Sequence, residues 1–215
     1  MTEPIAKGSS ETGRVEAFSD GVFAIAITLL VLEIQVPQPE VTGHGSTLLP
    51  ALLSLWPSYL GYLISFITIG IMWVNHHSMF VLIQRTDRYF LLISVFFLMC
   101  IAFLPFPTAV LAEYLADPKG RRVAVALYSA TFVLIALAYN AVWWYAARGG
   151  RLLHRKADRE AVETISKRYL VGPAAYGLSF VLAFVNPWAS LAVHGLLITF
   201  YILPVRKPTA SRPAI

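Results

Sequence analysis

RVEAFSDGVFAIAITLLVLE, residues 14–33, is the stretch that decides the fold. It begins with charged and polar side chains and continues as an almost unbroken apolar run. About 20 mostly apolar residues are enough for a helix to cross the hydrocarbon core of a bilayer. The stretch therefore predicts a transmembrane helix over residues 15–36 with ionisable groups at its entrance. Because such groups are costly near a membrane, each is a candidate functional residue.

The whole chain has the composition of a polytopic membrane protein. Of its 215 residues, 57% are hydrophobic and 13% are charged, whereas a soluble domain carries about 25% charged residues. The net charge of +5 does not indicate a nucleic-acid partner, because the basic residues cluster at the ends of apolar segments. We therefore expect an all-α bundle surrounded by membrane lipid.

Six apolar segments are long enough to be membrane helices. They cover residues 15–36, 50–80, 88–115, 122–147, 169–186 and 188–204. Together they predict one transmembrane domain over residues 14–204, between a flexible tail at 1–13 and a disordered tail at 205–215. Pro105 and Pro107 are expected to kink the third helix.

The basic residues predict the orientation of the chain. If the N-terminus is cytoplasmic, only three of them lie in outer loops, namely Lys119, Arg121 and Arg122. The other 14 lie in inner segments: Lys7, Arg14, Arg85, Arg88, Arg148, Arg151, Arg155, Lys156, Arg159, Lys167, Arg168, Arg206, Lys207 and Arg212. Cytoplasmic segments are enriched in Lys and Arg, so both termini are expected in the cytoplasm and the protein in the cell membrane.

Residues 146–168 form the only sizeable hydrophilic loop. They are expected to be a solvated basic connector that sets the topology. Part of this segment can form a short amphipathic helix on the cytoplasmic surface whose apolar side faces lipid or protein, namely Leu152, Leu153, Ala157 and Val162. Contact with anionic lipid is the alternative to the solvated connector.

The first helix separates an apolar face from a polar pair. With about 100° per residue, one group falls within about 60° of Ile25, namely Phe18, Gly21, Val22, Thr28, Leu29 and Leu32. Ser19 and Asp20 point about 120–140° away on either side. Periodicity alone leaves two interpretations open, because Ile25, Leu29 and Leu32 are equally suited to contact lipid or the protein core.

Asp20 lies about one turn inside the membrane and needs polar partners. Arg14 is one candidate, and the inner end of the second helix offers four more: Trp73, Asn75, His76 and His77. Both groups lie at the same depth, which predicts an interhelical hydrogen-bond network. A proton relay through Asp20 and His76 or His77 is the functional alternative.

No enzyme or metal motif is present in the sequence. It contains no HExxH, GxSxG, CxxC, P-loop or GxGxxG pattern. The adjacent His76 and His77 point about 100° apart on a helix, and Cys100 has no second cysteine to pair with. We therefore predict no catalytic residues, no metal and no cofactor. Glu33 is expected at the outer end of the first helix, either at a pore mouth that attracts cations or as a solvated interfacial carboxylate.

The pattern Arg14-x-x-x-Phe18-Ser19-Asp20 resembles the RxxxFSD signature of the transmembrane protein 175 family. This family comprises potassium channels of endosomes and lysosomes and their prokaryotic relatives. The continuation GVFAIAITLLVLEI and the segment Trp73-x-x-His76-His77-x-x-Phe80 also resemble prokaryotic members.

The resemblance implies six-helix subunits whose first helices surround a pore for passive potassium flow. It implies that Ile25, Leu29 and Leu32 form a hydrophobic constriction and that Thr28 contributes to selectivity. The motif residues and their partners would hold the pore helix in place, and these are Arg14, Phe18, Ser19, Asp20, Trp73, His76 and His77. The chain carries one copy of the signature, which implies a homotetramer.

Three functions stay open on the sequence. The favoured one is a potassium-preferring channel. The second is a proton-coupled or proton-permeable transporter that uses Asp20 with His76 or His77, and the third is a membrane scaffold or enzyme. A channel would pass ions far faster than a transporter.

Overall fold

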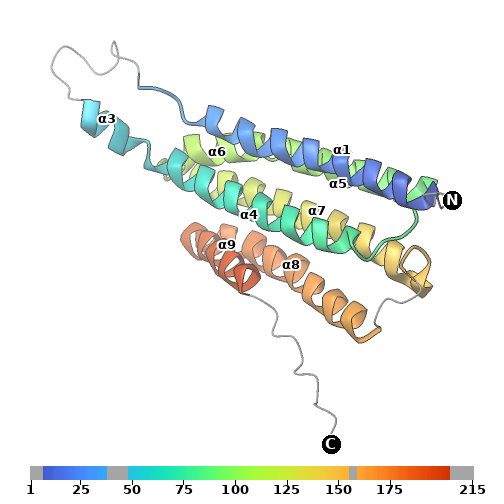
Figure 1. Ribbon diagram of the computed structural model, residues 1–215. Coiled ribbons are helices and arrows are strands. Elements are labelled where there is room, and N and C mark those ends of the chain that lie inside the picture. Colours follow the sequence, from blue (N-terminus) through green and yellow to red (C-terminus); the bar gives the residue numbers. More distant parts are fainter. Residues whose placement is uncertain (1–6, 38–47, 155–158, 204–215) are drawn as a thin grey trace, which may run out of the picture.

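The computed structural model describes residues 7–37, 48–154 and 159–203, and within them the chain is built from helices (Figure 1). The predicted all-α class is confirmed. The α-helices are α1 (Lys7–Leu29), α3 (Leu48–Ser54), α4 (Trp56–Phe80), α5 (Arg88–Phe103), α6 (Pro105–Tyr114), α7 (Arg121–Ala147), α8 (Arg159–Val185) and α9 (Pro187–Ile202). Two 3₁₀ turns, η1 (Leu30–Glu33) and η2 (Arg148–Gly150), follow α1 and α7. The tail predicted at 205–215 lies outside the described residues.

Five helical segments in the described part of the chain are long and apolar enough to cross a membrane. They are Glu11–Glu33, Trp56–Phe80, Arg88–Tyr114, Arg121–Gly150 and Val162–Val185. The protein is therefore a multi-pass membrane protein. The sixth predicted crossing corresponds to α9, which has 16 residues and is about 24 Å long at 1.5 Å per residue. Its role as a sixth crossing stays a prediction.

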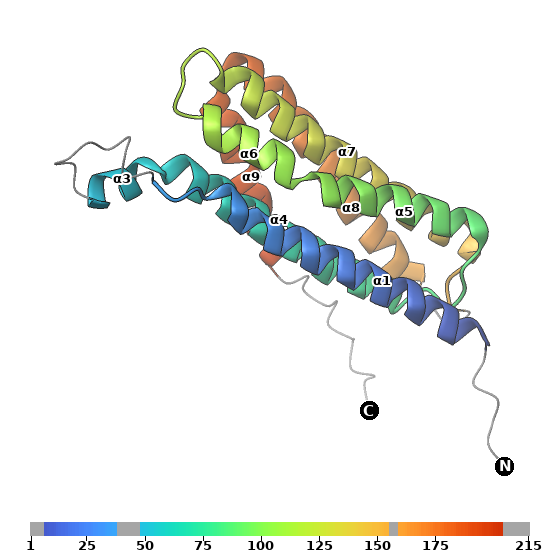
Figure 2. The same ribbon diagram turned by 90° about the horizontal axis from the view of Figure 1, so that it is seen from above.

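Helix α7 is the centre of the bundle, and α1 lies at its edge. In the most apolar window of each span, 67% of the residues are buried for α7 but only 22% for α1. Trp143, Tyr128 and Phe132 of α7 are fully buried. Figure 1 shows α1 along one edge and α8 with α9 along the opposite edge, and Figure 2 shows α1 lying along α4. Among the five candidate spans, α1 is thus the least buried within its own subunit.

Prolines interrupt two of the predicted helical segments. The segment at 50–80 is interrupted at Leu55, and α4 then starts with Pro57 in its first turn. The segment at 88–115 is interrupted at Leu104, directly before Pro105. Proline lacks a backbone N–H, so it fits the first turn of a helix and disrupts the interior.

Helix α1 begins at Lys7, inside the tail predicted at 1–13. Thr12 is buried, and its hydroxyl lies 3.4 Å from the carbonyl of Gln84 in the turn after α4. This contact with the rest of the subunit stabilises the helix in a polar segment that was predicted from the sequence to be a flexible tail. At the other end, the chain leaves the helix earlier than predicted, because Ile34 is extended.

The connector after α7 is less solvated than expected. Gly149 and Gly150 adopt positive φ angles of 66° and end the helix, a conformation that glycine adopts at little cost. Leu152 and Leu153 then turn into the protein, each 4% exposed. The proposed amphipathic helix is wrong for these two leucines, and Ala157 lies outside the described residues.

The buried leucines pair with the turn between α4 and α5. The N–H of Gln84 donates to the carbonyl of Leu152 at 2.8 Å, and the N–H of His154 donates to the carbonyl of Leu82 at 3.0 Å. Backbone groups that would otherwise lack partners are satisfied this way. The two turns therefore fix the same end of α4, α5 and α7.

Asp87 caps α5 from this turn. Its Oδ1 accepts a hydrogen bond from the N–H of Phe90 at 2.9 Å, and its Oδ2 accepts one from the Tyr145 hydroxyl at 2.8 Å. The Phe90 N–H, the Tyr145 hydroxyl and the nearby Arg151 charge hold the pKa of Asp87 below its usual value. The carboxylate thus joins the start of α5 to the end of α7.

We expect Asp87→Ala to lower the free energy of unfolding by about 1 kcal/mol at pH 7, because an N-cap acceptor is lost. Since folding lowers the pKa, the carboxylate stabilises the fold fully above the unfolded pKa of about 3.9. This contribution is lost as the pH falls through the folded pKa. Unfolding in detergent at several pH values measures it, with Asp87→Asn as a control that retains a cap acceptor. A wild-type stability equal to that of Asp87→Ala at pH 7 would contradict the assignment.

Candidate functional site

One face of α1 is packed against its own subunit. Phe23, Ala26 and Leu30 are at most 1% exposed. The Phe23 ring lies 5.4 Å from the His76 ring of α4 and 6.0 Å from the Phe97 ring of α5, measured between ring centres. This face fixes α1 in the groove between α4 and α5.

On the opposite face of α1, no described part of the subunit covers the side chains. Ile25 is 61% exposed, Leu29 is 40% exposed and Leu32 is 69% exposed. Gly21 and Thr28 are also exposed. These five residues form what we call the uncovered face. Of the residues that periodicity placed on this side, Val22 is half-buried instead.

The 3₁₀ turn η1 continues the uncovered face beyond the α-helix. In a 3₁₀ helix, side chains three residues apart are eclipsed, so Leu32 stands nearly above Leu29. Thr28 is the only hydroxyl on this face. It donates to its own helix, with the carbonyls of Ala24 and Ile25 both at 2.9 Å. The hydroxyl oxygen retains the capacity to accept.

Two polar contacts hold the entrance of α1 against α4. The indole Nε1 of Trp73 donates to Oδ1 of Asp20 at 2.8 Å. One turn away, Nδ1 of His77 lies 2.8 Å from Oε1 of Glu16. Figure 1 shows that α1 and α4 run antiparallel. A step of four residues along each helix, in opposite directions, therefore leads from one contact to the other.

Glu16 was not identified from the sequence. Two patterns pointed to it: Glu16 precedes Asp20 by four residues, and His77 follows Trp73 by four. Residues four apart share one face of a helix. An antiparallel pair in which Asp20 meets Trp73 therefore places Glu16 beside His77. The Trp73 and His77 rings also stack, with centres 6.4 Å apart.

His76 is surrounded by aromatic rings rather than by polar groups. It is fully buried, with the Phe80 ring centre at 4.5 Å and that of Phe97 at 5.9 Å. Neither ring nitrogen has a hydrogen-bond partner within the described residues. The structure therefore separates His76 from the Asp20 and His77 contacts with which it was grouped.

The remaining signature residues lie in different surroundings. Ser19 is fully buried, and its hydroxyl donates to the carbonyl of Val15 at 2.8 Å. Arg14 is exposed, and Phe18 is 60% exposed. Both line an open groove between α1 and the start of α5, together with Arg88. Within one subunit they take no part in the Asp20–Trp73 contact.

Glu33 lies at the far end of α1 in acidic surroundings. It lines a shallow pocket with Glu113 and Tyr114 of α6. Glu113 was not singled out in the sequence, because only the fold brings the ends of α1 and α6 together. Across the ranges 7–37, 48–154 and 159–203, no three His, Cys, Asp or Glu side chains gather closely enough to hold a metal ion.

Relatives of this chain cover almost its full length. The family model described as "Endosomal/lysosomal potassium channel TMEM175" matches residues 14–105. A potassium channel of Chamaesiphon minutus is 52% identical over 194 residues, which are 90% of this chain and 95% of that protein. A potassium channel of Streptomyces collinus is 46% identical over 208 residues, or 95% and 100% of the two chains.

A longer relative from Gallus gallus is described as an endosomal/lysosomal proton channel, TMEM175. It is 36% identical over 162 residues, which are 73% of this chain and 30% of that protein. The vertebrate relative thus shares one region with the present chain.

The solved structure of a Chamaesiphon minutus protein has the same fold. It superposes with a TM-score of 0.82 at 49% identity, covering 90% of this chain and 97% of the other. That structure is described as a lysosomal potassium-selective channel TMEM175 homolog. The resemblance first seen in RxxxFSD is therefore confirmed, and the chain belongs to the TMEM175 family.

Proposed function

We propose that this protein is a potassium channel of the cell membrane, assembled as a homotetramer with α1 of each subunit around a central pore. The observation that carries the proposal is the uncovered face of α1, whose opposite face is packed against α4 and α5. The relatives described as potassium channels match nearly the whole chain, which supports the assignment.

The uncovered face supplies the constriction. Ile25, Leu29 and Leu32 repeat along the helix at intervals of four and three residues. At 1.5–2 Å of rise per residue they cover about 11–12 Å of pore length. A narrow hydrophobic ring stops conduction by excluding the water that an ion needs for hydration. Opening requires the rings to widen.

Thr28 is proposed to act in selectivity. Four copies would place four hydroxyl oxygens around the path, between the levels of Ile25 and Leu29. Their hydrogens are directed to backbone carbonyls, so the oxygens can face a cation. Oxygen ligands of this kind replace part of the hydration shell of a permeating ion.

Four-fold assembly is what the family resemblance implies for a chain that carries one copy of the signature. One α1 cannot enclose a path for ions, whereas cyclic symmetry brings identical faces around one axis. Glu33 and Glu113 would then form an acidic ring at the outer mouth, which concentrates cations. Both termini are placed in the cytoplasm, with α9 as the sixth crossing.

The proton-relay alternative has less support. No hydrogen bond within the described chain joins Asp20 to His76 or His77, since Asp20 accepts from Trp73 and His77 contacts Glu16. Flux into liposomes under a potassium gradient tests the proposal, with sodium and a pH gradient as separate arms. Rapid potassium flux supports it. Flux that follows only the pH gradient overturns it.

We expect Ile25→Ala or Leu29→Ala to raise basal potassium conductance and to reduce discrimination against sodium, because a smaller side chain widens the hydrophobic ring. Single-channel recording in potassium and sodium measures both effects. Val31→Ala is the matched control: Val31 is 50% exposed near the same end of α1 but lies off the uncovered face. The constriction is wrong if a folded tetramer of Ile25→Ala conducts and selects like wild type.

We expect Asp20→Ala and Trp73→Phe each to lower the free energy of unfolding and the fraction of tetramer. The double variant should lower the free energy of unfolding by no more than the larger single effect, because the two substitutions remove the same hydrogen bond. Such a bond contributes about 0.5–1.5 kcal/mol. Unfolding in detergent with light scattering on the eluted protein measures the cycle. Strictly additive effects would show that the contact does not couple the two helices. The pair Glu16→Ala and His77→Phe provides an independent cycle one turn away.

A further inference from the structure

Helix α8 contains a proline in its interior, at Pro173. Proline has no N–H, so the carbonyl four residues earlier, that of Tyr169, loses its helical donor. Asn140 of α7 replaces it: the side-chain Nδ2 donates to the Tyr169 carbonyl at 2.9 Å, and also to the Ala136 carbonyl at 2.9 Å. A side chain of the central helix thus closes the break.

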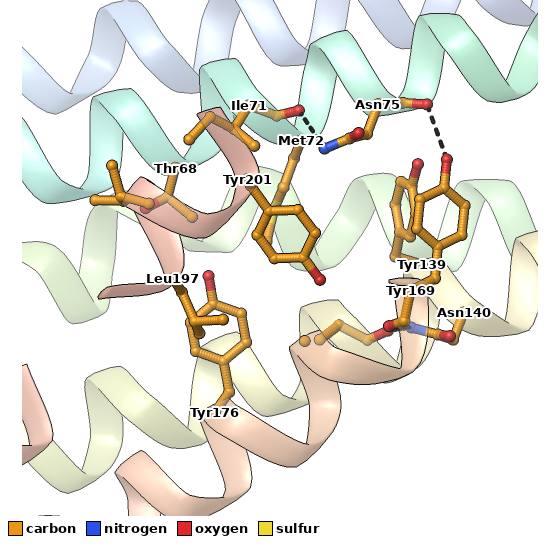
Figure 3. Close-up of a pocket in the computed structure, with 13 residues that line it drawn as sticks. Thr68, Ile71, Met72, Asn75, Tyr139, Asn140, Tyr169, Tyr176, Leu197 and Tyr201 are labelled. Atoms are coloured by element: carbon orange, nitrogen blue, oxygen red, sulfur yellow. Dashed lines mark hydrogen bonds between the residues drawn. The ribbon is translucent and has the colours of Figure 1, made fainter. Parts of the chain in front are cut away.

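Helices α9 and α4 also contact the break. The hydroxyl of Tyr201 donates to the carbonyl of Arg168 at 3.3 Å. The hydroxyl of Tyr169 donates to the carbonyl of Asn75 at 3.4 Å, as Figure 3 shows. A Cβ at Gly172 would stand 3.3 Å from the Tyr201 hydroxyl, so the small residue permits this approach.

A cavity of ≈ 50 Å³ lies beside the break, between α4, α7, α8 and α9. Figure 3 shows Tyr139 and Tyr169 side by side, with their hydroxyls toward α4, and Tyr201 reaching into the space between them and Leu197. The walls are mostly apolar and aromatic. The cavity lies away from the uncovered face of α1, because no residue of α1 lines it.

Two polar atoms of the cavity wall retain unused hydrogen-bonding capacity. Oδ1 of Asn140 has no hydrogen bond to any described residue, and the Tyr139 hydroxyl interacts with the Tyr169 hydroxyl alone, which leaves its remaining capacity unused among the described residues. Both residues are buried, at 7% and 6% exposure. A buried polar group without a partner is costly, and native proteins usually satisfy such groups with protein or with bound water.

The size of the cavity matches water. One buried water needs roughly 10–15 Å³ of space measured in this way, so the cavity has room for about three. It is smaller than the ~150 Å³ apolar cavity that accepts benzene. Asn140 Oδ1 accepts only, whereas the Tyr139 hydroxyl both donates and accepts. A water molecule can therefore bridge the two.

We propose that this cavity is a buried water site, in which two or three water molecules bridge Tyr139 and Asn140 and complete the repair of the proline break in α8. Asn140 would bind the waters through Oδ1 while its Nδ2 donates to the Tyr169 carbonyl. The Tyr169 hydroxyl in turn donates to the Asn75 carbonyl of α4. The bound water is thus part of the contact between α8 and α4, the helix that carries Trp73 and His77. This proposal does not depend on which ion the protein conducts.

Hydroxyl-radical footprinting of the full-length protein in lipid nanodiscs tests the site, because radicals generated in bound water modify the side chains beside it. We expect Tyr139 and Tyr176, which line the cavity, to be modified several-fold faster than Tyr128. Tyr128 is the control, since it is fully buried and its hydroxyl is bonded directly to Ser65 at 2.8 Å. Equal protection of all three tyrosines overturns the proposal.

The stability of Tyr139→Phe gives a second, independent readout. The substitution is made in a Tyr169→Phe background, where the contact between the two tyrosine hydroxyls is absent. If water satisfies the Tyr139 hydroxyl, its removal there loses a hydrogen bond and lowers the Tm by about 2–4 °C. If the hydroxyl is dry, its removal there relieves a cost and raises the Tm. Tyr128→Phe is expected to lower the Tm in either case and shows that the assay resolves one buried hydrogen bond. An unchanged or raised Tm for Tyr139→Phe overturns the proposal.

Discussion

The contact between α1 and α4 is the constraint on which the proposed pore depends. An apolar helix in a bilayer gains little from choosing one apolar neighbour over another, because lipid tails are as apolar as leucine. Polar bonds and close packing therefore have to set its rotation. Asp20 with Trp73 and Glu16 with His77 provide two such bonds one turn apart, which together fix rotation and register. The small, buried Ser19 lies on the covered side of α1 between them.

The same principle connects α4 to the rest of the bundle. Ser65 of α4 lies 2.9 Å from the Thr108 hydroxyl and 2.8 Å from that of Tyr128, all of them buried. Nearer the other end of α4, Asn75 accepts from Tyr169 of α8. Each bond joins a different helix to α4, so the helix that holds α1 is itself held by α6, α7 and α8.

The sequence was sufficient for properties that follow from periodicity and composition. Apolar runs predicted the helical membrane class, and the signature around Asp20 predicted the family. The 100° periodicity placed Ile25, Leu29 and Leu32 on one side, and these three are exposed in the subunit. Their role in conduction stays a proposal.

What the sequence could not supply depends on which helices meet. Glu16 gains a partner only through the antiparallel register of α1 and α4. Arg14 and Phe18 belong to the RxxxFSD signature, yet within one subunit they line the groove between α1 and α5. Leu152 is buried only because the turn after α4 pairs with the connector after α7. The donor for the Tyr169 carbonyl comes from Asn140, a position that no local pattern connects with Pro173.

The placement of polar side chains also limits how the proposed pore can work. Between Gly21 and Leu32 the uncovered face carries one polar group, the Thr28 hydroxyl, and its hydrogen is directed to its own helix. The ionisable groups of α1 lie no further along the helix than Asp20, and Asp20 and Glu16 are engaged with α4. A path lined in this way offers no fixed charge in its narrow part to replace the hydration energy of an ion. In the proposed pore the width of the apolar rings sets the barrier, and we therefore propose that the rotation of α1, which α4 fixes, controls conduction.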